Sequence, residues 1–471
     1  MGAQLRLPRP RLLTVERRER IHDAARRILE TGGLRVRLPE VVEAAARLGY
    51  AVRDDRVLIP GAVADDFVTQ TRAQGGKAPQ DPAEPSPEIL LAPCQYAIAV
   101  HDLDSDEIVP FTAHRLVEAS KLLDTLHPFG VIGKAPGTPV DVPPDLQPIM
   151  KYRVQALHCR HGQRPVELGT PRATPYLLDM AEALGHPITS ADVYVVSPLT
   201  VGGESLECAL AYRGRLRRVW VSNMSSLGAT APIRPGDALA VGAAEVIGAA
   251  ILVREATGLP VDWSIRVCPF DPRAMALTLG APEEFALALA SDELNAWYHG
   301  RGPGVPWGSL HTQAKLPDQQ SAAERLTLML LPALMGTRVF GGIGRMSLDE
   351  VFSAEQAVID VELRDHVQRL LADPEVDCDP EACLAEAAAG AEGGFLGLDS
   401  TAHSYRATYW WPRLFHRGML AEWQAAGASE LRARAKEMVR RQLRQYDFEP
   451  APDLRREVER IYARAARDLS A

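Results

Sequence analysis

From about residue 150 the chain alternates short runs rich in β-branched residues with longer segments of helical periodicity, and this pattern constrains the fold most strongly. Strands are expected at 193–197, 219–222, 261–267 and 338–340, with a weaker one at 304–311. Helices are expected at 237–256, 283–298, 320–335 and 354–371. Repeated βα units place such strands in a parallel sheet. Earlier strand candidates at 96–100 and 130–133 favour closure into an α/β-class (β/α)8 TIM barrel, and an open doubly wound sheet is the alternative.

The segments on either side of the barrel are expected to be helical. Helices at 15–30 and 39–48, a hairpin around Asp54 and Asp55, and a further helix to about residue 72 predict an N-terminal subdomain over 1–73. A Gly/Pro/Gln-rich linker over 74–88 separates it from the barrel, which is expected over 90–420. The charged stretch 421–471 is expected to form C-terminal helices that pack on the barrel.

The charge and cysteine content exclude several classes of function. The net charge is −9, so nucleic acid is not an expected partner. The six cysteines are scattered, which is typical of a reduced, cytoplasmic protein. No apolar core of a signal peptide follows the Arg-rich start, and no run approaches the length of a membrane span.

Several short motifs do not support the chemistry that they first suggest. Gly341–Gly344 lacks the G-x-G-x-x-G spacing of a nicotinamide site. Asp124 and His127 are separated by two residues instead of the single residue of the corrinoid-binding signature, so the chain is not expected to carry its own corrinoid domain. Neither 158–161 nor 378–383 has the paired spacing of a zinc site, and no metal is expected. A G-x-S-x-G hydrolase elbow is also absent from the sequence.

An ordered set of short segments resembles one known family over about residues 15 to 465. It includes Ser197-Pro198-Leu199, Gly228-Ala229-Thr230-Ala231-Pro232, Lys315-x-x-Asp318, Ser353-x-Glu355-Gln356 and Gly394-Phe395-Leu396. In this order they are similar to the trimethylamine methyltransferase family. The resemblance implies a barrel enzyme that docks a separate corrinoid protein over its mouth and passes a methyl group from nitrogen to Co(I). It also implies a homo-oligomer.

Departures from the family pattern bear on the substrate. The His311-Thr312-Gln313 loop and Gly344-Arg345 differ from the usual pattern. Trimethylamine-specific members of the family carry pyrrolysine, whereas this chain contains only standard residues. This favours a quaternary amine such as a betaine. A quaternary substrate leaves as a neutral tertiary amine and requires no general acid, which agrees with the lack of an identifiable acid–base pair. Cobalt-independent transfer to another acceptor, such as a folate, and a non-catalytic quaternary-amine binding protein are the alternatives.

The loops that follow the predicted strands provide the candidate site residues. Aromatic faces hold methylated ammonium groups, and basic side chains pair with a carboxylate. Substrate contacts are expected from Tyr96, Asn223, Arg266, Trp307, His311, Gln313, Lys315, Phe340 and Arg345. Close backbone approach to a ligand or planar cofactor is expected at Gly341, Gly342 and Gly344. Glu245 lies in a helix rich in small residues, where a buried polar contact is expected.

Overall fold

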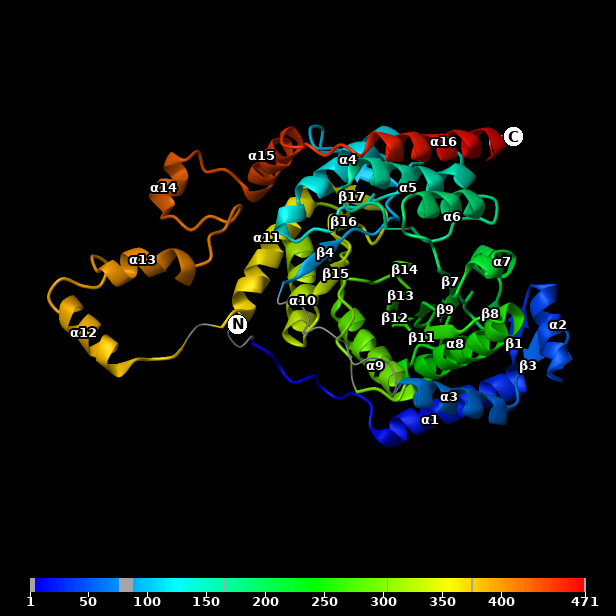
Figure 1. Ribbon diagram of the computed structural model, residues 1–471. Helices are drawn as coiled ribbons and strands as arrows, with labels where there is room; N and C mark the ends of the chain where they lie inside the picture. Colours follow the sequence, from blue (N-terminus) through cyan, green and yellow to red (C-terminus); the bar gives the residue numbers. More distant parts are fainter. Residues whose placement is uncertain (1–4, 76–87, 165, 303, 374–375, 470–471) are drawn as a thin grey trace.

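Two arcs of parallel strands form the centre of the computed structural model, which describes residues 5–75, 88–164, 166–302, 304–373 and 376–469 (Figure 1). The strands are β4 (Leu90–Ala92), β7 (Ser190–Tyr194), β9 (Arg218–Ser222), β11 (Val261–Ser264) and β15 (Val339–Gly341). In the first arc β9 lies between β7 and β11. In the second arc β15 pairs with β4, and single parallel bridges at Ser309 and Val131 extend it on either side.

Helices α4 to α11 lie around the two arcs (Figure 1). They are α4 (Ala113–Thr125), α5 (Gln147–His158), α6 (Thr174–Ala183), α7 (Glu204–Ala211), α8 (Pro235–Thr257), α9 (Pro282–Tyr298), α10 (Gln319–Leu334) and α11 (Ala354–Leu371). The predicted α/β class with parallel strands and intervening helices is confirmed. Among the described residues no strand pairing joins the two arcs, so the predicted closure into a barrel stays a prediction.

Alternation along the first arc separates a buried face from an accessible one. Val193, Val221 and Trp263 are partners in register and are buried on the side where α7 and α8 pack. Trp220 and Tyr194 point to the opposite side, because successive side chains of a strand alternate between faces. They are 42% and 44% exposed although both lie on central strands. The face of the first arc opposite α7 and α8 is therefore accessible to solvent.

The second arc begins earlier than the sequence predicted. The sequence predicts a barrel strand at 96–100, but in the structure it is β4 that pairs with β15 in the parallel arc. Residues 99–101 instead form β5 (Ala99–His101), which pairs antiparallel with β6 (Ile108–Pro110) and parallel with β17 (Val351–Ser353). Ile89 and Leu91 are fully buried, and this short apolar run gave too weak a signal to outweigh the longer one that follows. The strand expected at 304–311 is reduced to the bridge at Ser309.

Further short strands occur in the loops between these units. They are β8 (Thr200–Val201), β10 (Ser225–Ser226), β12 (Val267–Cys268), β13 (Phe270–Asp271), β14 (Ala276–Leu277) and β16 (Arg345–Met346). β10 pairs in parallel with β12, and β13 forms a hairpin with β14. β16 pairs antiparallel with β17. These pairings fix the loops at the carboxyl ends of the central strands.

The N-terminal elements share a hydrophobic core with α8. They are α1 (Val15–Arg27), a π-helical turn (Ile28–Gly32), β1 (Leu34–Val36), α2 (Pro39–Arg47), β2 (Ala51–Arg53), β3 (Arg56–Leu58) and α3 (Gly61–Gly75). The predicted hairpin is confirmed as the β2–β3 pair, and Asp54 at its turn has φ 54°. β1 also pairs in parallel with β8. Residues 76–87 of the predicted linker lie outside the described residues.

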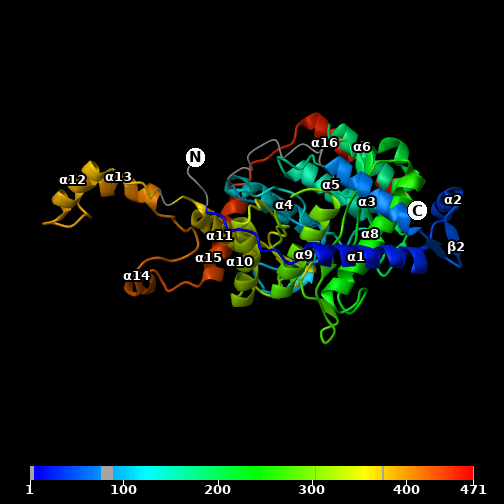
Figure 2. The same ribbon diagram turned by 90° about the horizontal axis from the view of Figure 1, so that it is seen from below.

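The C-terminal region has two parts with different packing (Figures 1 and 2). α15 (Leu431–Arg444) packs on α4 and α11, and α16 (Pro452–Leu469) packs on α5 and α6. By contrast, α12 (Pro380–Gly390), α13 (Asp399–Thr408) and α14 (Leu420–Ala425) stand away from the body in both views. The sequence did not predict this separation.

One helix in the described part of the chain, α8, has the length and apolar composition of a membrane span. In its most apolar window 83% of the residues are buried inside the protein, as expected for a central core helix.

Candidate active site

Three segments that are distant in the sequence meet at one carboxylate. Tyr96 follows β4, Glu167 lies between α5 and α6, and Tyr194 ends β7. The Tyr96 hydroxyl donates to Glu167 Oε1 at 3.0 Å, and the Tyr194 hydroxyl donates to the same oxygen at 3.3 Å. The two phenols therefore hold an exposed carboxylate in a fixed position beside two aromatic rings.

The surroundings keep both phenols protonated. Desolvation by the surrounding protein is the largest effect on the pKa of Tyr96 and of Tyr194, and the negative charge of Glu167 is the next. Together they raise both pKa values well above the usual value for tyrosine. Nearly half of each side chain nevertheless remains accessible to solvent. Both groups thus stay hydrogen-bond donors to Glu167, and their ring faces stay open to a ligand.

Two further side chains on the accessible face of the first arc belong to the same region. Asp192 lies on β7, and its strand partner Trp220 lies on β9. Burial, and next the charge of Glu167, raise the pKa of the Asp192 carboxyl. Aromatic faces combined with carboxylates attract a weakly hydrated organic cation. We refer to Tyr96, Glu167, Asp192, Tyr194 and Trp220 as the cation-binding cluster.

A guanidinium group occupies a neighbouring position after β11. The Arg266 guanidinium lies over the Trp307 ring, with 4.7 Å between its central carbon and the ring centroid. Its Nη2 atom is 3.4 Å from Glu284 Oε1, and its side chain is 22% exposed. The indole of Trp307 is itself exposed. Arg266 is thus held by stacking and a long ion pair while part of the guanidinium faces solvent, which suits recognition of a carboxylate.

His311 is oriented by the same acidic residue. Its Nδ1 atom is 2.7 Å from Glu284 Oε1, and the residue is 5% exposed. Burial, and next the nearby Arg345 guanidinium, lower the pKa of His311. The imidazole is therefore neutral at pH 7 and donates its Nδ1 proton to Glu284. Among the described residues Nε2 of His311 has no hydrogen-bond partner.

Cys94 follows β4. Burial raises the pKa of its thiol, and the charges of Arg345, Asp349, Glu167 and Arg266 all act on it. Arg345 forms an ion pair with Asp349, which reduces its net charge. The charges of Glu167 and Arg266 thus act on the same thiol, with opposite effects on its pKa. Such a bipolar arrangement is complementary to a small zwitterion.

Four of the sequence-predicted residues make contacts within the protein. Asn223 donates to Glu245 at 2.9 Å and accepts from the Arg266 amide at 2.9 Å. Gln313 donates to the carbonyl of Leu277 at 2.5 Å. Lys315 donates to Ser347 at 2.8 Å. Phe340 is fully buried in a hydrophobic core.

Glu245 makes the buried polar contact that was predicted for it. Its carboxylate is inaccessible to solvent and accepts hydrogen bonds from two loops. The donors are Ser197 Oγ at 2.8 Å, the Leu199 amide at 2.8 Å, Asn223 Nδ2 at 2.9 Å and Ser225 Oγ at 2.5 Å. Helix α8 thereby fixes the loops after β7 and β9 relative to each other.

The three glycines predicted to approach a cofactor form a tight turn between β15 and β16. Gly342 has φ 100° and Gly344 has φ 72°. A Cβ atom on Gly344 would lie 2.5 Å from the Phe352 ring, and one on Gly342 would lie 2.6 Å from the Arg345 guanidinium. Gly341 takes part in the β4–β15 ladder. The close approach that these glycines permit is thus to the protein's own side chains.

His101, Asp106 and Glu355 have the composition of a metal site, and their ligand atoms lie within 4.8 Å of one another. Two cations of α15 are present instead. Lys436 Nζ is 2.8 Å from Asp106, and Arg432 Nε is 3.0 Å from Glu355. These ion pairs neutralise both carboxylates, so the cluster acts as an attachment point for α15.

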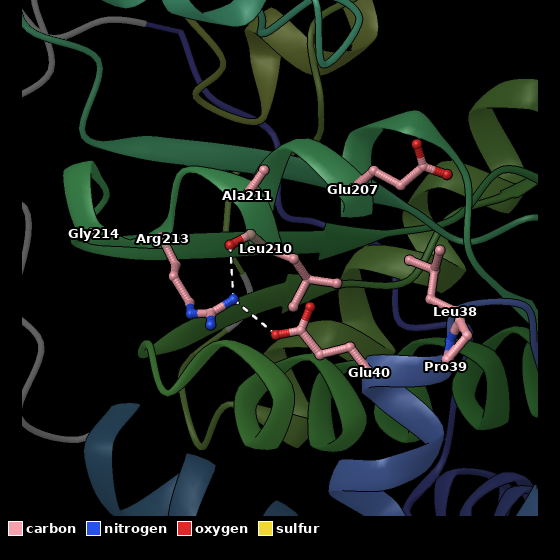
Figure 3. Close-up of a pocket in the computed structure, with 8 residues that line it drawn as sticks. All are labelled: Leu38, Pro39, Glu40, Glu207, Leu210, Ala211, Arg213 and Gly214. Carbon is pink, nitrogen blue, oxygen red and sulfur yellow. Dashed lines mark hydrogen bonds and ion pairs between the residues drawn. The ribbon is translucent and has the colours of Figure 1, made fainter.

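A cavity of about 620 Å³ lies between α2 and α7, away from the strand ends (Figure 3). Its most polar feature is an ion pair of 2.8 Å between Arg213 and Glu40, and Arg213 also donates to the Leu210 carbonyl. Glu207 is a second carboxylate in the lining, but no aromatic face lines the cavity, so it lacks the rings that hold an organic cation.

Sequence reasoning identified Tyr96 and Arg266 in this region and missed four residues of the cation-binding cluster. Tyr194 and Trp220 carried a usable signal, because they alternate with the buried valines of β7 and β9. Asp192 follows the same alternation. Glu167 carried no such signal, since no strand or helix pattern surrounds it.

Comparisons with known proteins agree on one family. Residues 3–468 match the sequence profile of a family described as trimethylamine methyltransferase. A trimethylamine methyltransferase from Desulfitobacterium hafniense is 24% identical over 92% of this chain and 89% of its own length. A glycine betaine methyltransferase from the same species is 22% identical over 88% of this chain and 89% of its own length.

A trimethylamine methyltransferase from Methanosarcina mazei is 28% identical over 61% of this chain, and the match spans 58% of that relative's length. Among solved structures, the monomethylamine methyltransferase of Methanosarcina barkeri has a TM-score of 0.43 and 10% identity, over 92% of both chains.

Proposed function

The chain belongs to the trimethylamine methyltransferase family, and from that membership we propose that it transfers a methyl group from a quaternary, betaine-like methylamine to the Co(I) of a separate corrinoid protein. The proposal includes closure of the two strand arcs into a (β/α)8 barrel over 90–420. Residues 1–73 and 421–471 then form the flanking helical parts. The glycine betaine methyltransferase among the relatives supports the substrate class.

The contact of Tyr96 and Tyr194 with Glu167 is the observation on which the proposal depends. A trimethylammonium group donates no hydrogen bond and carries a diffuse positive charge, so it is held by ring faces and a nearby carboxylate. The cation-binding cluster offers three rings and two carboxyl groups on one accessible face. A neutral or anionic substrate would gain nothing from this arrangement.

The methyl acceptor would approach from the solvent side of the strand ends. Exposed apolar side chains there, Trp307 and Met275 on the β13–β14 turn, fit the broad macrocycle of a corrinoid. When bound, the corrinoid supplies the cobalt nucleophile for an in-line displacement at the methyl carbon. The chain's own residues fix the ammonium and align one N–CH3 bond toward the opening. The leaving group is a neutral tertiary amine, so no residue needs to donate a proton.

A reconstituted methyl-transfer assay tests the proposal. The purified protein is mixed with a reduced corrinoid protein and a panel of betaines, trimethylamine, and a tetrahydrofolate acceptor. Corrinoid methylation with at least one betaine, and none with trimethylamine, is expected. Methylation of folate without cobalt would favour the cobalt-independent alternative. Tight betaine binding with no transfer to any acceptor would favour a binding protein.

Arg266 is proposed to pair with the substrate carboxylate. Replacing Arg266 with alanine removes a charge-assisted hydrogen bond, and we expect KM for a betaine to rise about 10- to 100-fold, which corresponds to about 1.5–3 kcal/mol. Tetramethylammonium lacks a carboxylate and provides the control, since its dissociation constant should not change in the same variant. Equal loss for both ligands would remove Arg266 from carboxylate recognition.

Asp192 is proposed to make substrate binding pH-dependent. Its pKa is raised by burial and by Glu167, so it loses its charge at a higher pH than an ordinary aspartate. Attraction for the cation is complete above this raised pKa and is lost as the pH falls through it. We expect KM for a betaine to rise on acidification, and Asp192→Asn to remove that rise. A profile that is unchanged in Asp192→Asn would contradict this role.

A further inference from the structure

Residues 376–425 form an arm that stands away from the rest of the molecule (Figures 1 and 2). The chain enters the arm after α11 and leaves it into α15, so the arm is not a free terminus. At its base the amides of Arg413 and Phe415 donate to the Glu362 carboxylate of α11 at 3.1 and 3.0 Å. The arm is thus anchored at its base, while α12 to α14 make little contact with the body.

The arm exposes large apolar side chains. Leu396 is 89% exposed, Met419 is 76% exposed, and Leu384 and Leu420 are each 66% exposed. Trp411 is also more than half exposed. These side chains all belong to one segment of the chain, and extended exposed apolar surface marks contacts with another molecule.

The body carries a groove that matches this surface. It has a volume of about 630 Å³ and lies between α1, α8 and α9. Leu13, Ile21 and Leu287 contribute apolar lining. The charged side chains of the lining are Arg17, Arg20 and Asp237, so positive charge is in excess. The groove therefore fits an apolar segment that carries acidic residues.

The charge of the arm is complementary to that of the groove. Between residues 376 and 399 the sequence has no Lys or Arg, and its acidic residues are Asp377, Asp379, Glu381, Glu386, Glu392 and Asp399. The residues of this segment other than Gly390 and Leu398 are exposed. Charge complementarity of this kind fixes the register of an interface and selects the partner.

The arm of one copy does not reach its own groove, because in both views α12 to α14 extend away from α1 (Figures 1 and 2). A second copy presents the same groove and the same arm. If the arm of each copy lies in the groove of the other, the two contacts are equivalent and are related by a twofold axis. A stable interface uses about 20–30 residues on each side, and the arm provides a segment of that size or more.

We propose that two copies of this chain form a dimer by exchanging arms, with each arm lying in the α1/α8/α9 groove of the other copy. The proposal does not depend on the proposed function, and its test reads only the state of association.

Light scattering after gel filtration of the full chain tests the exchange. The wild type is expected to be a dimer at micromolar concentration. Leu396→Asp places a charge at the most exposed apolar position of the arm and should raise the dimer dissociation constant at least tenfold. Val52→Asp on β2, outside both the arm and the groove, is the matched control and should remain a dimer. A monomeric wild type, or a Leu396→Asp variant as dimeric as the wild type, would overturn the proposal.

A charge-swap experiment identifies the groove as the partner of the arm. One variant carries Arg17→Glu and Arg20→Glu, and another carries Glu381→Lys and Glu392→Lys. Each alone should be a weakened dimer, because groove and arm then carry like charges. In a mixture both contacts become complementary, so a heterodimer should form at concentrations where neither variant pairs with itself. Failure of the mixture to associate would rule out this groove.

Discussion

Replacing Glu167 with glutamine is expected to lower kcat/KM for a betaine about 100-fold. The change removes the negative charge that Tyr96 and Tyr194 hold in place but keeps an oxygen that accepts from both phenols. Two unit charges 4 Å apart near a protein surface interact by about 4 kcal/mol, and the exposure of Glu167 reduces this to about 2–3 kcal/mol. Steady-state kinetics with the reduced corrinoid protein measures the loss.

Two comparisons separate the charge of Glu167 from its hydrogen bonds. Glu167→Ala should be no more than a few-fold worse than Glu167→Gln if charge is the main contribution. Because Glu167 is exposed, neither variant should lower the unfolding temperature by more than a degree or two. If Glu167→Gln turns over betaines at the wild-type rate, the cation-binding cluster is not the substrate site.

Replacing Glu245 with alanine is expected to destabilise the protein by about 3–5 kcal/mol. Four donors from the segments after β7 and β9, two of them buried and two partly buried, would lose their acceptor at once. An unsatisfied buried polar group costs about 1–3 kcal/mol, and partial relaxation of the loops keeps the sum below the additive value. The midpoint of urea unfolding, followed by circular dichroism, measures the effect.

Glu255→Ala, on the same helix, is the matched control. Glu255 is partly exposed and forms an ion pair with its neighbour Arg254, so its removal should change stability by less than about 0.5 kcal/mol. Similar losses in both variants would mean that the Glu245 contacts contribute no more than a surface ion pair. Loss of activity in Glu245→Ala with unchanged stability would instead place Glu245 in the reaction.

The long periodic elements could be predicted from the sequence because local signals agreed with the tertiary environment. The helix predicted over 354–371 matches α11 at both ends, and Ser353 caps its first turn by accepting from the Gln356 amide. The strand at β9 was found because Val219 and Val221 have high β propensity. Such signals depend on neighbouring residues alone, so one sequence is enough to read them.

The site was harder to predict because its members come from different units. Glu167 becomes important only when the loop after β4 brings Tyr96 to it and the end of β7 brings Tyr194. The sequence predicts Phe340 as a ligand contact because it lies near a strand end. In the structure its side chain points into the hydrophobic core and is fully buried. Side-chain direction along a short strand depends on pairing register, which the sequence alone does not fix.

The central claim is that a positively charged nitrogen is recognised at the cation-binding cluster. The most direct measurement compares, by titration calorimetry, the binding of glycine betaine with that of 3,3-dimethylbutanoate, in which carbon replaces the nitrogen without changing shape. We expect glycine betaine to bind at least about tenfold more tightly, a difference of about 1.4 kcal/mol, and the preference to vanish in Glu167→Gln. Equal affinity of the wild type for both compounds would contradict the account.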